Sequence, residues 1–311
     1  MSSPLTTATT TCSEDTSVTD TSDAFITLTH HLASPTPLHI SLLPSSSPSI
    51  LFSPPHLGIP KPALISAFAQ ARQLFFSSSP TPAASLILLL VSSEHITAIN
   101  HRKRLLLSND DGISPLGELL LTESLLTSTM PRVNKSPAVW GYRRWLLTTF
   151  PSLLTLSAEE ELRMVRLSGE QHPRNYYAWE YARWAFSTLP ASPADELQRQ
   201  LSWCQLHVSD ISGWTFLSWL LSRPGVEVGT VRRVLKEVLG YATVAPGHEA
   251  LWGFVRIVGV RLGREVWEGV LNEGGGEGGE RGEGVGEERK WDKRLRERSV
   301  AWVGKWGESE E

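Results

Sequence analysis

The sequence predicts an all-α protein, a right-handed solenoid (α-α superhelix) of about five helix hairpins. Two observations predict this fold: a Trp- and Arg-rich stretch recurs along the chain, and a second helix-forming stretch precedes each copy. The stretch is most complete at residues 134–147, which read Asn-Lys-Ser-Pro-Ala-Val-Trp-Gly-Tyr-Arg-Arg-Trp-Leu-Leu. A repeat period of about 20–50 residues indicates stacked structural units, and each unit here would be a pair of helices.

Each copy is aligned by one anchor residue near the start of its second helix. The anchors are Ile99, Trp140, Trp179, Trp214 and Trp252, separated by 41, 39, 35 and 38 residues. We expect the four tryptophans to lie in the repeat core, because large aromatic side chains dominate buried surface. Four residues after each anchor, the chain carries Lys103, Arg144, Arg183, Ser218 and Arg256. Four of these five residues are basic, and we expect them to be structural, pairing with acids such as Glu160 or Glu161 or bonding the ends of neighbouring helices. Arg144 and Arg183 are assigned to the repeat core.

Three of the helix-forming stretches that precede an anchor carry recognisable capping residues. Ser157 and Glu160 match the capping box, in which each side chain binds the other residue's backbone amide. Ser-Pro pairs at Ser114 and Ser192 open two further helices, because proline suits the first helical turn. These signals predict a helical-repeat domain over residues 60–267.

The flanking segments differ from the repeats in composition. Residues 1–24 are rich in Ser, Thr and Asp and are expected to form a disordered tail. Residues 25–59 are expected to be an irregular Pro/Ser-rich segment, whose short apolar runs would be strands or extended segments laid over the helices. A Gly/Glu-rich linker is expected over residues 268–290. Residues 291–311 would hold a short C-terminal helix and an acidic end, and this helix would cap the last repeat or lie on a partner.

Composition narrows the class of protein. The formal net charge of −4 gives no reason to expect nucleic acid as a partner. The two cysteines, Cys12 and Cys204, lie in a polar tail and an apolar helix, which argues against a disulfide framework and for a reducing compartment. We find no signal-peptide pattern and no apolar run of the ~20 residues that a membrane span needs. The sequence therefore predicts a cytoplasmic protein.

Two motifs carry a resemblance to a known family. Residues 135–145 read Lys-Ser-Pro-x-x-Trp-x-x-Arg-Arg-Trp, and residues 173–184 read Pro-Arg-Asn-Tyr-x-Ala-Trp-x-x-x-Arg-Trp. They resemble the repeats of protein prenyltransferase alpha subunits, whose pattern is Pro-Lys-Asn-Tyr-x-x-Trp-x-x-Arg-Arg. The resemblance covers roughly residues 60–262, and the variant turns are most similar to the repeat-containing branch of the family, the alpha-like subunit of a type III geranylgeranyltransferase.

The resemblance implies a function that this chain would perform only with a partner. Alpha subunits of this family wrap a beta subunit, which carries the zinc and the lipid pocket. The heterodimer joins an isoprenoid from its diphosphate to a cysteine near the C-terminus of an acceptor protein. We find no metal-ligand pattern in this sequence, so zinc is expected in the beta subunit. Geranylgeranyl is favoured over farnesyl, and a non-catalytic helical-repeat adaptor is the alternative function.

Candidate site residues lie in the turns that precede the anchor helices. Lys135 stands where the family has a functional lysine, and the resemblance implies that it stabilises the departing diphosphate. A solvated lysine in a turn is the other interpretation of Lys135. Arg174, Asn175 and Tyr176 occupy the next such turn and are expected to contact substrate or partner, with Asn175 also capping its helix.

The spatial relation of these two turns separates the alternatives. If they lie side by side on the concave face of the solenoid, the enzymatic interpretation gains; if they point in unrelated directions, the adaptor gains. Some departures from the family favour the adaptor. The first anchor is Ile99 rather than Trp, and the fourth copy, residues 213–221, has no basic pair.

Overall fold

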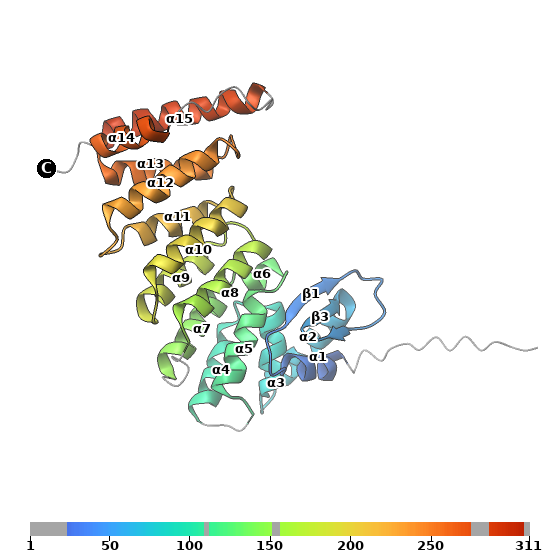
Figure 1. Ribbon diagram of the computed structural model, residues 1–311. Coiled ribbons are helices and arrows are strands. Elements are labelled where there is room, and N and C mark those ends of the chain that lie inside the picture. The colour runs from blue at the N-terminus through green and yellow to red at the C-terminus, as the bar shows by residue number, and fades with distance from the viewer. Residues whose placement is uncertain (1–23, 109–111, 151–155, 275–285, 308–311) are drawn as a thin grey trace, which may run out of the picture.

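Helices dominate the computed structural model, which describes residues 24–108, 112–150, 156–274 and 286–307. Five hairpins stack along one direction, as Figure 1 shows, and the all-α solenoid predicted from the repeats is confirmed. The hairpins are α3 (Pro82–Val91) with α4 (Ile96–Leu107), α5 (Pro115–Leu126) with α7 (Pro137–Thr149), α8 (Ala158–Gln171) with α9 (Tyr176–Thr188), α10 (Pro193–Leu206) with α11 (Ile211–Leu221), and α12 (Val228–Ala242) with α13 (Glu249–Leu262).

The second helices of successive hairpins lie against one another in the order α4, α7, α9, α11 and α13. α4, α7, α9 and α11 each begin where a polar side chain binds a free backbone amide, whereas His248 at the start of α13 makes no such bond. The Ser136 hydroxyl accepts from Val139 N at 3.2 Å, and an Asp210 carboxylate oxygen accepts from Gly213 N at 3.0 Å. The capping box of Ser157 and Glu160 is present at the start of α8. These caps satisfy amides that a helix cannot pair internally.

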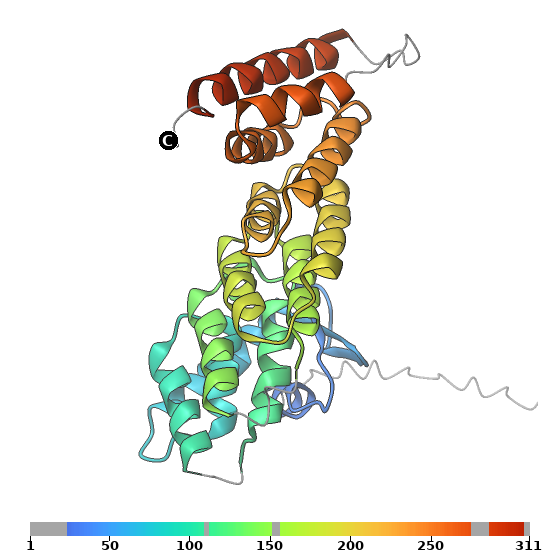
Figure 2. The same ribbon diagram turned by 60° about the vertical axis from the view of Figure 1, so that its left-hand side comes forward.

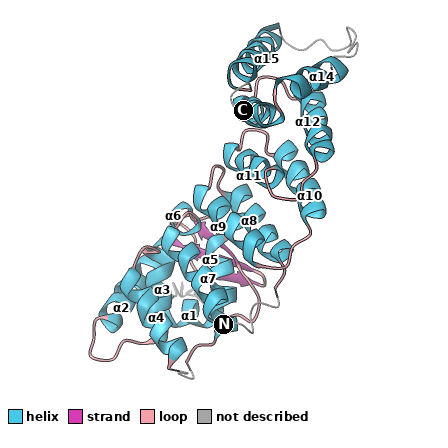
Figure 3. Cartoon of the chain, turned by 90° about the vertical axis from the view of Figure 1, so that its left-hand side faces the viewer, coloured by secondary structure: helices cyan, strands magenta, loops and turns pink. Residues whose placement is uncertain are grey.

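Residues 25–59 are more regular than the irregular segment expected from their prolines, although the short strands expected there are present. They include α1 (Ala24–Leu32), which ends before those prolines begin, and three short strands: β1 (His39–Leu43), β2 (Leu51–Ser53) and β3 (His56–Pro60). The strand order is β1-β3-β2, with β1 parallel and β2 antiparallel to β3 (Figure 3, strands in magenta). Thr129 N donates to Ile40 O at 3.1 Å, which fixes the sheet to the loop after α5. Helix α2 (Lys61–Phe75) then packs on α1 and α3.

The C-terminal region is more helical than the linker prediction allowed. Helix α14 (Arg264–Gly274) begins before residue 268 and continues into the expected linker, and α15 (Gly286–Trp306) starts before its end. Residues 275–285 of that linker lie outside the described residues, as do the predicted tail at 1–23 and the acidic end at 308–311. Leu295 and Val303 of α15 are buried where this helix packs on α13, at the end of the stack opposite α1 (Figure 2).

Apolar side chains between the helices form one continuous core. The anchors Trp140, Trp179, Trp214 and Trp252 are all buried in it. The packing is close enough to restrict residue size, because a side chain at Gly213 would overlap the indole ring of Trp203. Within the described residues, no helix is both long and apolar enough to cross a membrane.

A buried arginine links the first two hairpins. The Arg102 guanidinium forms a two-pronged ion pair with Glu118, with 2.7 Å between Nε and Oε2. Its remaining nitrogen donates to Pro82 O at 2.7 Å and to the Ser85 hydroxyl at 2.9 Å. The Tyr142 hydroxyl donates to the same carboxylate at 2.8 Å. One cation therefore joins α3, α4, α5 and, through its acid, α7.

The same arrangement recurs one hairpin later around Arg143. Its Nε and Nη2 atoms lie 2.8 and 2.6 Å from the Glu161 carboxylate, which also accepts the Tyr181 hydroxyl. Its Nη1 donates to Leu119 O at 2.7 Å and to Thr122 Oγ1 at 3.1 Å. Glu161 and Tyr181 correspond to Glu118 and Tyr142 around Arg102. Leu119 and Thr122 correspond to Pro82 and Ser85. We call these two clusters the arginine units.

The arginine units correct the prediction for the position four after the anchor. Arg144 is exposed, and its guanidinium lies over the ring of Trp184 at 5.2 Å instead of pairing with Glu160 or Glu161. Arg183 is half-buried and binds Glu180 on its own helix at 3.3 Å. The inward position is three after the anchor, because that residue faces the preceding and following first helices.

Removing the buried guanidinium should be far more damaging than removing its exposed neighbour. Arg143→Ala leaves the buried Glu161 unpaired and should lower the free energy of unfolding by roughly 3–5 kcal/mol. Arg144→Ala on the same helix should cost about 1 kcal/mol or less, since it loses only a surface cation–π contact. Urea denaturation of both variants measures the difference, and equal losses would contradict the assignment.

The pH dependence of stability offers a second test. Burial alone would raise the pKa of Glu161, but the Arg143 guanidinium and the Tyr181 hydroxyl outweigh burial, so the pKa is lowered. A lowered folded-state pKa adds stability that is complete above the unfolded value of about 4.5 and is lost as the pH falls through the folded value. The stability deficit of Glu161→Gln should therefore be largest at neutral pH and shrink in acid. Denaturation between neutral and acidic pH measures it, and a constant deficit would refute this account.

Candidate functional site

The turns before the second helices form a continuous row, which we call the turn row. It consists of residues 92–95, 134–136, 172–175, 208–210 and 247–248. Each turn binds the next through at least one polar contact. Ser136 donates to Glu94, Lys135 Nζ donates to Pro173 O at 3.2 Å, Arg174 N donates to Asp210 at 2.7 Å, and Ser209 Oγ lies 3.1 Å from His248 Nδ1. Figure 1 shows α6 (Pro131–Asn134), which leads into the second turn, on the side of the stack that carries the sheet.

Lys135 is the half-buried residue that ends α6. Its ammonium group uses one proton on Pro173 O, which leaves two protons for other acceptors. The Lys135 ammonium acts on the neighbouring His172. The pKa of His172 is lowered, first by burial and second by repulsion from this ammonium. His172 is therefore held mainly neutral at pH 7, and Lys135 supplies the charge at this point of the turn row.

Arg174 has a backbone conformation that is unusual for a residue with a side chain. Its φ is +61°, in the left-handed region. The backbone amide is held by Asp210, whose other carboxylate oxygen caps α11. Because the backbone alone makes this bond, the Arg174 guanidinium stays exposed beside the Lys135 turn.

Asn175 does not reach the surface, which corrects its assignment as a substrate or partner contact. Its side chain is fully buried, with Nδ2 2.6 Å from Asn134 Oδ1 and 3.1 Å from Ser168 Oγ. Its Oδ1 accepts from Ala178 N and caps α9. All of its polar atoms bind the scaffold, so Asn175 positions the turn and cannot touch a ligand.

Tyr176 points outward from the first residue of α9. Its side chain is 62% exposed, and its ring meets that of Tyr177 edge-on with 5.5 Å between centroids. The structure thus brings Lys135, Arg174 and Tyr176 to neighbouring points of the surface. It keeps the anchor tryptophans apart from them in the core, where Trp140 donates its indole N–H to Asn134 O at 2.9 Å.

Sequence reasoning missed Asn134, Arg102 and Arg143. A signal for the two arginines exists, since they are 41 residues apart and match the spacing of their anchors. Asn134 offers no such signal, because its role depends on Asn175 and Ser168 from the next hairpin.

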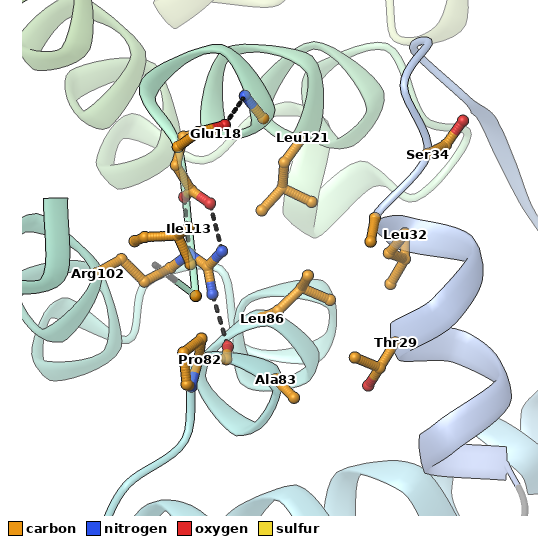
Figure 4. A pocket seen from close by; sticks show the side chains of 14 residues that line it. Thr29, Leu32, Ser34, Pro82, Ala83, Leu86, Arg102, Ile113, Glu118 and Leu121 are labelled. Carbon is orange, nitrogen blue, oxygen red and sulfur yellow. Dashed lines mark hydrogen bonds and ion pairs between the residues drawn. The ribbon is translucent and has the colours of Figure 1, made fainter. Parts of the chain in front are cut away.

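A cavity lies away from the turn row, between α1, α3 and α5. It encloses about 490 Å³, and Arg102 and Glu118 form part of its wall (Figure 4). Leu32, Leu86 and Leu121 supply apolar walls. The ion pair there is already the centre of an arginine unit, and the lining residues that the structure describes include no other charged group. Among the described residues, no three His, Cys, Asp or Glu side chains lie close enough together to hold a metal ion.

The stacked hairpins and their linked turns define an α-helical repeat protein, and its sequence is similar to proteins named for prenyltransferase alpha-subunit repeats. Sequence comparison confirms the resemblance expected from the motifs. Residues 140–238 match the family model described as the ECM9 middle domain. The chain is 31% identical over 157 residues to protein prenyltransferase alpha subunit repeat-containing protein 1 of Homo sapiens, an alignment that covers 43% of this chain and 38% of that relative.

Two further relatives are similar to this chain at comparable identity. Protein ECM9 of Saccharomyces cerevisiae is 32% identical over 141 residues, covering 43% of this chain and 37% of its own length. The geranylgeranyl transferase type-2 subunit alpha of Mus musculus is 29% identical over 157 residues, covering 49% and 27%. The chain therefore spans less than two fifths of the length of these relatives.

The buried role of Asn175 can be tested against its exposed neighbour. Asn175→Ala removes the cap of α9 and one of the hydrogen bonds that Asn134 Oδ1 accepts, and should cost roughly 1–3 kcal/mol of unfolding free energy. Tyr176→Ala should change stability by about 0.5 kcal/mol or less, because the ring lies at the surface. Thermal or urea denaturation compares the two, and a larger loss for Tyr176→Ala would contradict the assignment.

Proposed function

We propose that this chain is the alpha-type subunit of a heterodimeric protein prenyltransferase. The partner would be a beta subunit that carries zinc and the lipid pocket. The pair would transfer an isoprenoid, with geranylgeranyl favoured, from its diphosphate to a cysteine near the C-terminus of an acceptor protein. The observation that carries the proposal is the contact between Lys135 and the Pro173–Tyr176 turn. One relative is a geranylgeranyl transferase type-2 subunit alpha, which supports the choice of reaction class.

The chemistry requires positive charge at the leaving group. The acceptor thiolate forms a bond to C1 of the isoprenoid, the C1–O bond breaks, and diphosphate leaves with its electron pair. Charge accumulates on the diphosphate oxygens in the transition state, and a fixed cation stabilises that charge more than the ground state. The Lys135 ammonium has two free protons for this role. The exposed Arg174 guanidinium and Tyr176 hydroxyl on the next turn would contact substrate or partner.

Reconstitution tests the proposal directly. The full chain would be combined with a prenyltransferase beta subunit, labelled geranylgeranyl diphosphate and acceptor proteins with C-terminal cysteines. We expect a stable complex that transfers lipid, and no transfer by the chain alone. A stable complex that transfers no lipid to any acceptor would overturn the enzymatic proposal.

Lys135→Ala should separate catalysis from assembly. We expect kcat/KM of the complex to fall by roughly 10²-fold, the usual effect of losing one transition-state charge contact. Complex formation should be unchanged, because the scaffold bond lost is a single surface contact to Pro173 O. Lys61→Ala, an exposed lysine at the start of α2, is the matched control. Turnover equal to wild type in Lys135→Ala would remove the assigned role.

A non-catalytic adaptor is the second candidate, and the arginine units favour it. Arg102 and Arg143 are fully engaged in the scaffold, so these basic residues of the repeats are unavailable to a ligand. The fourth hairpin has no basic pair in α11. Under this alternative, the reconstituted pair would assemble and would transfer no lipid, and Lys135→Ala would leave partner binding intact.

A further inference from the structure

The turn row borders an open groove that the sequence motifs did not indicate. It measures about 550 Å³ and lies between the residues that follow α3 and the α6 turn. Its apolar wall comes from Val91, Pro131 and Pro137, and its charged groups are Glu94, Arg132 and Lys135. Lys135, the proposed site residue, therefore shares this groove with a second cation.

The local backbone places both cations on the same side. Arg132 and Lys135 are three residues apart around a single helical turn, a spacing that brings side chains to one face. The two residues between them, Val133 and Asn134, are buried and face the core. Arg132 O accepts the Ser93 hydroxyl at 2.7 Å, so the turn is fixed to the opposite wall of the groove.

The charge balance of the groove favours an anion. The Arg132 side chain is exposed, and no ion pair to it occurs among the residues that the structure describes. Glu94 is the one carboxylate in the lining, and it accepts the Ser136 hydroxyl. The groove lining therefore has two cations, Arg132 and Lys135, and one acid, Glu94, which already binds Ser136. Arg174 adds a third cation on the adjacent turn.

We propose that Arg132 is a second phosphate-binding residue of the lipid diphosphate site, acting beside Lys135. This inference rests on the proposed function. A diphosphate has several negatively charged oxygens, and one lysine neutralises only part of that charge. The planar guanidinium of Arg132 can bind two of these oxygens at once, whereas an ammonium acts as a point charge. Arg132 touches substrate directly, and its position ahead of the repeat motif explains why the motif does not include it.

The experiment compares Arg132→Ala, Arg132→Lys and Arg233→Ala in the reconstituted complex. Arg233 is an exposed arginine of α12, far along the chain from the groove, and serves as the control. In Arg132→Ala we expect the KM for geranylgeranyl diphosphate and the inhibition constant of inorganic diphosphate to rise together by roughly tenfold. Arg132→Lys should lie between Arg132→Ala and wild type, and Arg233→Ala should match wild type. Unchanged constants in Arg132→Ala would overturn the inference while leaving the proposed function intact.

A binding measurement keeps the two proposals distinguishable. Calorimetric titration of the full chain with inorganic diphosphate needs no lipid transfer and no beta subunit. Binding by wild type that weakens in Arg132→Ala, but not in Arg233→Ala, would support the groove even if the complex proved inactive. Absence of diphosphate binding by both the wild-type chain and its complex, or equal binding by Arg132→Ala, would overturn it.

Discussion

The buried arginine–glutamate pair is the interaction on which the first three hairpins depend. A guanidinium as buried as that of Arg102 is tolerated only when its charge is matched and its N–H groups find acceptors. Glu118 matches the charge, and the Pro82 carbonyl and Ser85 hydroxyl of α3 accept from the remaining nitrogen. The Tyr142 hydroxyl donates to the same carboxylate. Because the acceptors come from different helices, the need to satisfy one charge fixes the register between neighbouring hairpins. The first three turns of the turn row inherit their spacing from this register.

The later hairpins are held differently. The position occupied by Arg102 and Arg143 is Ala182 in α9 and Leu217 in α11. The acid of α10, Glu196, is bound instead by an arginine of α8 at 2.6 Å. Between α9 and α10, aromatic contacts replace the arginine unit, with 4.9 Å between the ring centroids of Trp179 and Trp203. The solenoid therefore changes from polar to aromatic packing partway along its length.

The sequence predicted the hairpins well because the spacing of the anchor residues can be read directly along the chain. It predicted the wrong arginine, since adjacent residues of a helix differ by about 100° and the repeat alone does not say which of two basic residues faces inward. The burial of Asn175 depends on Asn134, 41 residues earlier, and the contact of Lys135 depends on a carbonyl 38 residues later. Such through-space partners, like the pairing of three short strands among prolines, are set by tertiary packing.

The overlap that excludes a side chain at Gly213 limits how this sequence can diverge. A substitution there is blocked by the ring of Trp203 on the neighbouring helix, whereas Gly141 on α7 has open space around it. The residue at position 141 is therefore expected to vary in size. Position 213 can accept a larger residue only if position 203 becomes smaller, so these two sites are expected to evolve as a pair.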